Sequence, residues 1–73
     1  MDFLLEDANG RLLGIEVKAT ATVQTDDFRH LRAVGEWLGA RWAGGVVLYT
    51  GATLTPFGER LWAMPIPCLW QAG

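Results

Sequence analysis

The first third of the chain alternates between apolar and polar stretches in the way typical of a β-hairpin. The apolar run Phe3–Leu5 is followed by a polar stretch with Asn9-Gly10, a dipeptide favoured in two-residue hairpin turns because both positions tolerate positive φ. The chain then returns through Leu12–Ala19, a strand whose side chains alternate between two faces. One face carries Leu13, Ile15, Val17 and Ala19, and the other carries Leu12, Gly14, Glu16 and Lys18. The second face therefore places two charged residues among apolar neighbours.

Beyond the hairpin the pattern changes to helical spacing. Thr25, Asp26 and Asp27 are typical of a helix start, because Thr can cap the first turn and aspartates favour the positive end of the helix dipole. The apolar positions that follow are Phe28, Leu31, Val34 and Leu38. Gly39 is typical of a helix C-terminus, so we predict a helix of about four turns. Gly35 in its interior predicts close packing on a sheet, since glycine there costs about 1 kcal/mol relative to alanine.

Two further strands complete the expected fold. Gly44-Gly45 opens a continuous apolar run, Val46–Thr50, of the kind found in strands buried on both faces. A loop containing glycines and a proline leads to Leu61–Ile66, which we assign to a sheet edge because Pro65 cannot donate a hydrogen bond. The order β-β-α-β-β predicts an α/β fold, a mixed four-stranded sheet with one crossover helix.

Length and composition bound the class of protein. The 73 residues allow one domain, 1–73, and a chain this short buries only about 60% of its unfolded surface. It is 51% apolar with four tryptophans, which excludes a disordered segment and indicates that apolar surface meets a partner or a missing part of the protein. A net charge of −2 argues against a basic nucleic-acid binder, so contact with DNA would need a local positive patch.

The single cysteine, Cys68, excludes an internal disulfide and indicates a reducing, cytoplasmic environment, where we interpret it as a buried inert thiol. No apolar run approaches the about 18 residues that a membrane span needs, so no membrane partner is expected.

Three charged side chains are expected to converge at the open end of the hairpin. With the turn at Asn9-Gly10, Asp2 falls opposite residues 17 to 18, within reach of both Glu16 and Lys18. Two converging carboxylates can hold a hard divalent cation such as Mg²⁺, and a lysine beside them can orient a water or stabilise charge developing on a phosphate. Asp2, Glu16 and Lys18 are therefore the candidate catalytic residues for phosphodiester hydrolysis.

The same residues carry a resemblance to a known group of proteins. Asp2, followed on the next strand by Glu16-Val17-Lys18, resembles the signature of the PD-(D/E)XK nuclease superfamily, an Asp and then Glu-x-Lys. A wider set of segments is similar to the C-terminal domain of bacterial AAA-type ATPases of unknown function. These segments are Asp2–Glu6, Gly14–Ala19, Asp27–Leu31, Gly45–Tyr49 and Leu61–Pro65, which together span nearly the whole chain. The resemblance implies a truncated restriction-endonuclease-like core.

By this resemblance Asp2 and Glu16 would hold Mg²⁺, with the Val17 carbonyl as a third ligand, and Lys18 would position the attacking water. The superfamily core begins with a helix and a strand that have no counterpart before Met1, and the chain contains no P-loop motif. We therefore expect a C-terminal fragment of a larger ATPase, with ATP bound only by the absent N-terminal part. Nuclease activity of the fragment itself is expected to be weak or absent.

Purely structural explanations stay open for the charged residues. Glu16 and Lys18 also fit an exposed ion pair, worth about 0–1 kcal/mol. Arg29 and Arg32 fit either a phosphate contact or an ordinary solvated helix face, and His30 is interpreted as a helix-surface residue.

A second function also stays open, a non-catalytic module that binds DNA, another protein or a second copy of itself. An uncovered sheet edge and sheet face favour a homodimer. We expect Trp62, Trp70 and the first hairpin to contribute to it, with at least about 1,000 Å² buried in total.

Overall fold

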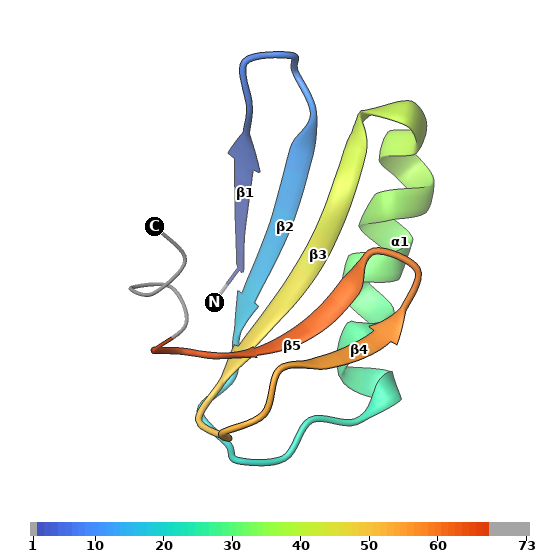
Figure 1. Cartoon of the computed structure of the whole chain (residues 1–73). Coiled ribbons are helices and arrows are strands. Elements are labelled where there is room, and N and C mark those ends of the chain that lie inside the picture. The colour runs from blue at the N-terminus through green and yellow to red at the C-terminus, as the bar shows by residue number, and fades with distance from the viewer. Residues whose placement is uncertain (1, 68–73) are drawn as a thin grey trace.

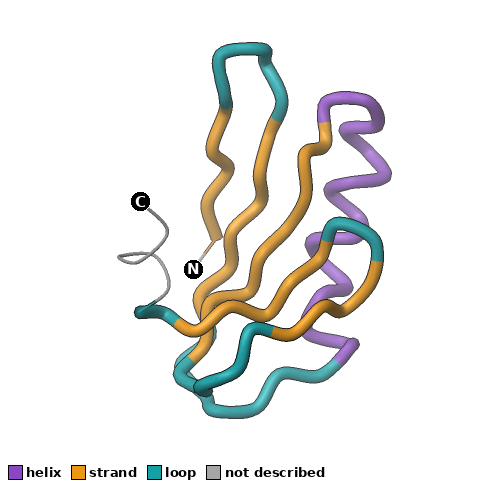
Figure 2. The backbone as a smooth tube through the Cα atoms, viewed as in Figure 1, coloured by secondary structure: helices purple, strands orange, loops and turns teal. Residues whose placement is uncertain are grey.

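The protein is a mixed sheet covered on one face by a helix, as seen in the computed structural model, which describes residues 2–67 (Figures 1 and 2). In chain order the elements are β1 (Asp2–Glu6), β2 (Leu12–Val17), the 3₁₀ turn η1 (Thr25–Phe28), α1 (Arg29–Leu38), the 3₁₀ turn η2 (Gly39–Arg41), β3 (Trp42–Tyr49), β4 (Thr55–Gly58) and β5 (Leu61–Pro65). The predicted α/β class is confirmed.

The sheet has five strands in the order β1-β2-β3-β5-β4. β1 pairs with β2 and β4 pairs with β5 in antiparallel fashion, and each is a hairpin. β3 lies between the two hairpins and pairs in parallel with β2 on one side and with β5 on the other. The connection from β2 to β3 carries η1 and α1, as parallel strands require a long crossover.

The predicted count of four strands is wrong, because the expected loop before β5 contains β4. Pro56 and Gly58 lie within this short strand, and both residue types are rare in central strands. β4 can hold them because it is an edge strand, where a residue without an N–H need not complete a second ladder.

The assignment of the last strand to the sheet edge is also wrong, because β5 lies between β3 and β4. Pro65 is tolerated there as the final residue of the strand, opposite Tyr49. The pairing of β4 ends earlier, at Ala63, so Pro65 needs no donor on that side. On the β3 side the ladder is continued by Ile66, whose N–H donates to the Tyr49 carbonyl at 3.0 Å.

The core lies between α1 and one face of the sheet. Phe28 at the helix start and Val47 in β3 are fully buried, and the Phe28 ring stacks on Phe57 of β4 with centroids 4.8 Å apart. The rest of this cluster consists of Leu31, Trp42, Tyr49, Leu61 and Ala63, whereas Val46 and Leu48, which are also buried, alternate to the opposite face of β3. Burying a side chain of this size contributes about 1.5–3 kcal/mol, so this layer holds the helix on the sheet.

Three glycines bring the helix close to the sheet around the Trp42 ring. A Cβ on Gly14 of β2 would lie 2.8 Å from Trp42 and from Leu31, and one on Gly35 of α1 would lie 2.8 Å from the indole nitrogen. A Cβ on Gly45 of β3 would come within 3.0 Å of the same ring. The predicted reason for a glycine in the helix interior is therefore confirmed: a larger residue would occupy the space of Trp42.

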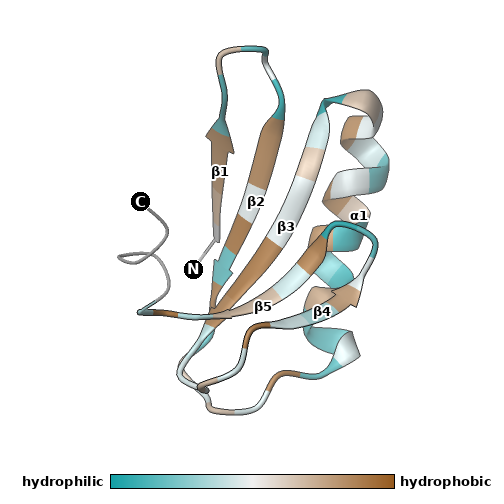
Figure 3. Cartoon of the chain, viewed as in Figure 1, coloured by the Kyte–Doolittle hydropathy of each residue, from teal (hydrophilic) through white to brown (hydrophobic). Residues whose placement is uncertain are grey.

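The opposite face of the sheet is apolar and carries no helix among residues 2–67. Register pairs on this face join Phe3 to Ile15, Ile15 to Val46 and Val46 to Trp62. Phe3 is 46% exposed and Trp62 is 42% exposed. Apolar residues recur along β1, β2 and β3 in Figure 3. We call the row Phe3, Leu5, Ile15, Val17 and Trp62 the open apolar face.

Within the described part of the chain, α1 is too short and too polar to cross a membrane.

Candidate functional site

The hairpin register places Asp2 directly opposite Glu16, not opposite residues 17 to 18 as the sequence predicted. The turn accounts for the shift. The Asp7 carboxylate accepts hydrogen bonds from the Asn9 and Arg11 backbone N–H groups at 2.8 and 2.9 Å, and the Asp7 N–H donates to the Arg11 carbonyl. The turn is therefore closed by the pair Asp7 and Arg11, and the pairing of the other residues in the hairpin shifts to match. Residues paired across antiparallel strands share a face, so Asp2 and Glu16 occupy the same, helix-covered side.

Glu16 brings a carboxylate to the edge of the core. In register it lies between Asp2 of β1 and the fully buried Val47 of β3. Its Oε2 atom is buried and has no hydrogen-bond partner among the described residues. An unsatisfied buried polar atom costs about 1–3 kcal/mol, more when charged. Such an atom in a small, otherwise well-packed domain calls for a reason.

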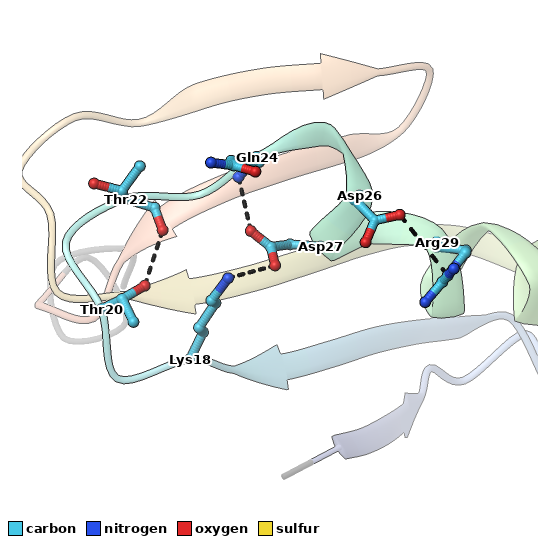
Figure 4. A network of polar contacts seen from close by, with 7 residues as sticks. All are labelled: Lys18, Thr20, Thr22, Gln24, Asp26, Asp27 and Arg29. Carbon is cyan, nitrogen blue, oxygen red and sulfur yellow. Dashed lines mark hydrogen bonds and ion pairs between the residues drawn. The ribbon is translucent and has the colours of Figure 1, made fainter.

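Lys18 lies just past the end of β2 on the same face as Glu16. Its backbone N–H donates to the Leu48 carbonyl at 2.8 Å, which continues the parallel ladder with β3. Its ammonium forms an ion pair with the Asp27 carboxylate on η1 (Figure 4). The two side chains are 35% and 22% exposed. Lys18 is therefore held at the junction between the strand end and the start of the helix.

Asp27 is the residue that sequence reasoning missed at this site. The sequence pattern around Asp27 indicated only a helix start, and Asp27 does have that role. The Gln24 N–H donates to Asp27 Oδ2 at 2.7 Å, and the Asp27 N–H donates back to the Gln24 carbonyl at 2.9 Å. The hydrogen bond from Gln24, and then that from Lys18, lower the pKa of Asp27 below its ordinary value. The crossover topology was the available signal, since a helix that follows β2 must start near the end of that strand.

The other candidate residues lie outside the pair formed by Lys18 and Asp27. Val17 faces the opposite side from Glu16 in the strand alternation and pairs with Leu48, and its role as a carbonyl ligand stays a prediction. Arg29 forms an exposed 3.9 Å ion pair with Asp26, and Arg32 donates to the Phe57 carbonyl at 3.1 Å.

His30 lines a cavity of about 290 Å³ between β1 and α1, together with Phe3, Leu4, Leu31 and Val34. Cys68 and Trp70 lie outside the described residues.

The fit of this face to a metal ion rests on Glu16 and on the register of Asp2. Among the side chains that the structure describes, no three His, Cys, Asp or Glu residues cluster as a metal site. A cation bound here would take the unpartnered Glu16 oxygen as one ligand and would need further oxygen ligands, and Asp2 is the residue in register opposite Glu16. The donor set is the oxygen type that Mg²⁺ prefers.

Fold and site together define a small mixed α/β domain. One end of its helix-covered face carries the Glu16 carboxylate and Lys18, which is ion-paired with Asp27. The chain belongs to the DUF4143 family, a domain of unknown function, whose model matches residues 1–69. No curated protein and no solved structure matches it.

Proposed function

We propose that this domain is the nuclease-like part of an AAA-type ATPase and hydrolyses phosphodiester bonds in DNA with Mg²⁺. One observation carries the proposal: the buried Glu16 Oε2 has no donor among the described residues and lies on the face where Asp2 is in register. A buried carboxylate without a partner is costly, and a divalent cation would compensate it.

Each residue of the site has a defined role in this proposal. Asp2 and Glu16 would hold the ion, with the Val17 carbonyl as a third ligand. When bound, Mg²⁺ would act as a Lewis acid toward a phosphate oxygen. Lys18 donates hydrogen bonds through its ammonium, so it can orient a water molecule and stabilise negative charge that develops on the phosphate. The Lys18–Asp27 pair fits this role, because it already places the ammonium on the Glu16 side of β2.

Titration calorimetry with Mn²⁺ and Mg²⁺ tests the metal site directly. We expect one site in the unmodified chain and a loss of at least about tenfold in affinity for Glu16→Gln, since the amide removes the charged ligand. Glu59→Gln is the matched control, because Glu59 is exposed on the turn between β4 and β5. Equal affinity in all three proteins, or no binding in any, would contradict the metal site.

A cleavage assay tests the reaction separately. We expect weak Mn²⁺-dependent nicking of supercoiled DNA by the 73-residue chain, and its loss in Lys18→Ala. A rate that Lys18→Ala leaves unchanged would refute the role of Lys18, once a contaminating nuclease has been removed by repurification.

The ATPase context and the location of the protein belong to the same proposal. The sequence resemblance supports the ATPase context, and ATP would bind outside this chain because the chain has no P-loop motif. The single cysteine supports a cytoplasmic location.

A second function is favoured by the open apolar face, which an enzyme site does not require. Phe3, Leu5 and Trp62 are each about half exposed on it, and β1, which carries Phe3 and Leu5, is an edge strand. Exposed apolar patches of this kind mark interaction surfaces. We propose that a second copy of the chain covers this face, making the domain an oligomerisation module.

Sedimentation equilibrium at micromolar concentration tests the dimer. Trp62→Ser should weaken self-association, whereas Trp37→Ser on α1 should not, although Trp37 is 85% exposed. Circular dichroism confirms that both variants are folded. A monomer at all concentrations, or equal effects of the two substitutions, would exclude this surface as a dimer interface.

A further inference from the structure

Lys18 is held at both ends by contacts that leave it little freedom. Its backbone is fixed to β3 by the 2.8 Å bond to Leu48, and its ammonium is fixed to Asp27. A lysine side chain otherwise samples many rotamers because its four-carbon stem is flexible. Asp27 therefore determines where the Lys18 ammonium lies.

The carboxylate of Asp27 is itself oriented by a second donor. Oδ1 accepts from the Lys18 ammonium, and Oδ2 accepts from the Gln24 N–H at 2.7 Å (Figure 4). With one donor on each oxygen, rotation of the carboxylate breaks at least one hydrogen bond. The Lys18 ammonium is therefore held at a defined position relative to η1, where the helix starts.

The neighbouring ion pair on the same turn shows what an unconstrained pair looks like. Asp26 and Arg29 are separated by 3.9 Å, and their side chains are 76% and 83% exposed. The Lys18–Asp27 pair is considerably more buried, so water screens it less. Asp26 is therefore a natural internal control for Asp27.

On the basis of the nuclease-like function proposed above, we propose that Asp27 is the positioning residue for Lys18. Its carboxylate anchors the ammonium to η1, the 3₁₀ turn that leads into α1, on the side of β2 that carries Glu16. Asp27 contacts neither the metal nor the substrate in this role. It fixes the one group of the site that could otherwise swing away from the phosphate.

Asp27→Asn separates positioning from the capping role. The amide oxygen can still accept the Gln24 N–H, so the helix start is kept, while the charge that attracts Lys18 is lost. In nuclear magnetic resonance spectra of the full chain, a fixed Lys18 shows inequivalent Hε protons and cross-peaks to the Asp27 Hβ protons. We expect Asp27→Asn to merge the two Hε signals, and Asp26→Asn to leave them unchanged. Inequivalent Hε protons in Asp27→Asn would overturn the assignment.

Titration with Mn²⁺ alone distinguishes a positioning residue from a metal ligand. Asp27→Asn should change the Mn²⁺ affinity by less than about twofold, whereas loss of a ligand changes it by at least about tenfold. A tenfold loss would show that Asp27 is a ligand and would also overturn the assignment. If the unmodified chain binds no Mn²⁺ at all, the metal-dependent function fails, and the Lys18 signals still decide whether Asp27 holds the lysine.

Discussion

On the helix-covered face of the sheet, large side chains fill slots left by glycines, whereas on the opposite face an apolar row has no described element above it. Trp42 is 8% exposed on the first face, and Trp62 is 42% exposed on the second. The charged candidates, Glu16 and Lys18, lie on the covered face. Partial burial there reduces the screening of their contacts by water. The comparison indicates that the helix, the largest buried cluster and the charged candidates share the covered face, whereas the opposite face keeps half-exposed apolar side chains.

The largest expected difference between the two faces comes from removing one phenylalanine from each. Phe28→Ala should lower the free energy of unfolding by about 3–5 kcal/mol, because it empties a fully enclosed position. Phe3→Ala should lower it by only about 1 kcal/mol, because Phe3 is already half exposed. Urea denaturation of both variants measures the difference. Similar losses would show that the open apolar face is part of the folded core.

Adding a methyl group at Gly35 tests how tightly the helix packs on the covered face. Alanine favours a helix over glycine by about 1 kcal/mol, yet a Cβ at this position meets the Trp42 indole at 2.8 Å. We expect Gly35→Ala to lower the free energy of unfolding by about 1–3 kcal/mol. Trp42→Leu should remove most of this penalty in a double-mutant cycle. A stabilising Gly35→Ala would mean that the slot accepts a methyl group.

Removing the charge of Glu16 should stabilise the metal-free protein. The buried Oε2 has no donor among the described residues, and a neutral amide is cheaper to bury than a carboxylate. We expect Glu16→Gln to raise the free energy of unfolding by about 1 kcal/mol near neutral pH, measured with a chelator present. A loss of stability would show that the carboxylate has a partner within the chain.

The smallest effect is a pH dependence that belongs to Asp27. Because its pKa is lowered in the folded state, the charged form stabilises the fold above the unfolded pKa of about 3.9. This contribution is lost as the pH falls through the lower, folded pKa. We expect Asp27→Asn to flatten the acid limb of the stability curve by about 0.5–1 kcal/mol, and Asp26→Asn to leave that limb in place. Identical curves for the two variants would contradict the difference between the two ion pairs.

Elements with a strong local pattern could be predicted from the sequence. The alternation in Leu12–Ala19 and the helical spacing of Phe28 and Leu31 were enough to find β2 and the helix, although β2 ends at Val17 and the first turn of the expected helix is the 3₁₀ turn η1. β4 was missed because its four residues include Pro56 and Gly58 and form a strand only by pairing with β5. Local propensity does not contain that long-range pairing.

The candidate site could be predicted only in part, for a related reason. Alternation along one strand correctly placed Glu16 and Lys18 on the same face. The register of Asp2 depended on how the Asp7 side chain closes the turn, which the Asn9-Gly10 signal did not reveal. The Lys18–Asp27 contact joins a strand end to a helix start, so it follows from the crossover and not from any motif.

The position of β3 between two hairpins has a kinetic consequence for how the chain acquires its structure. Each hairpin joins neighbours in sequence, and hairpins form in about 1–10 μs. The parallel pairings of β3, such as Glu16 with Val47, close long loops and recover their entropy cost only late. We therefore expect the insertion of β3 between the two hairpins to limit the folding rate, so that substitutions in β3 slow refolding more than those in β1.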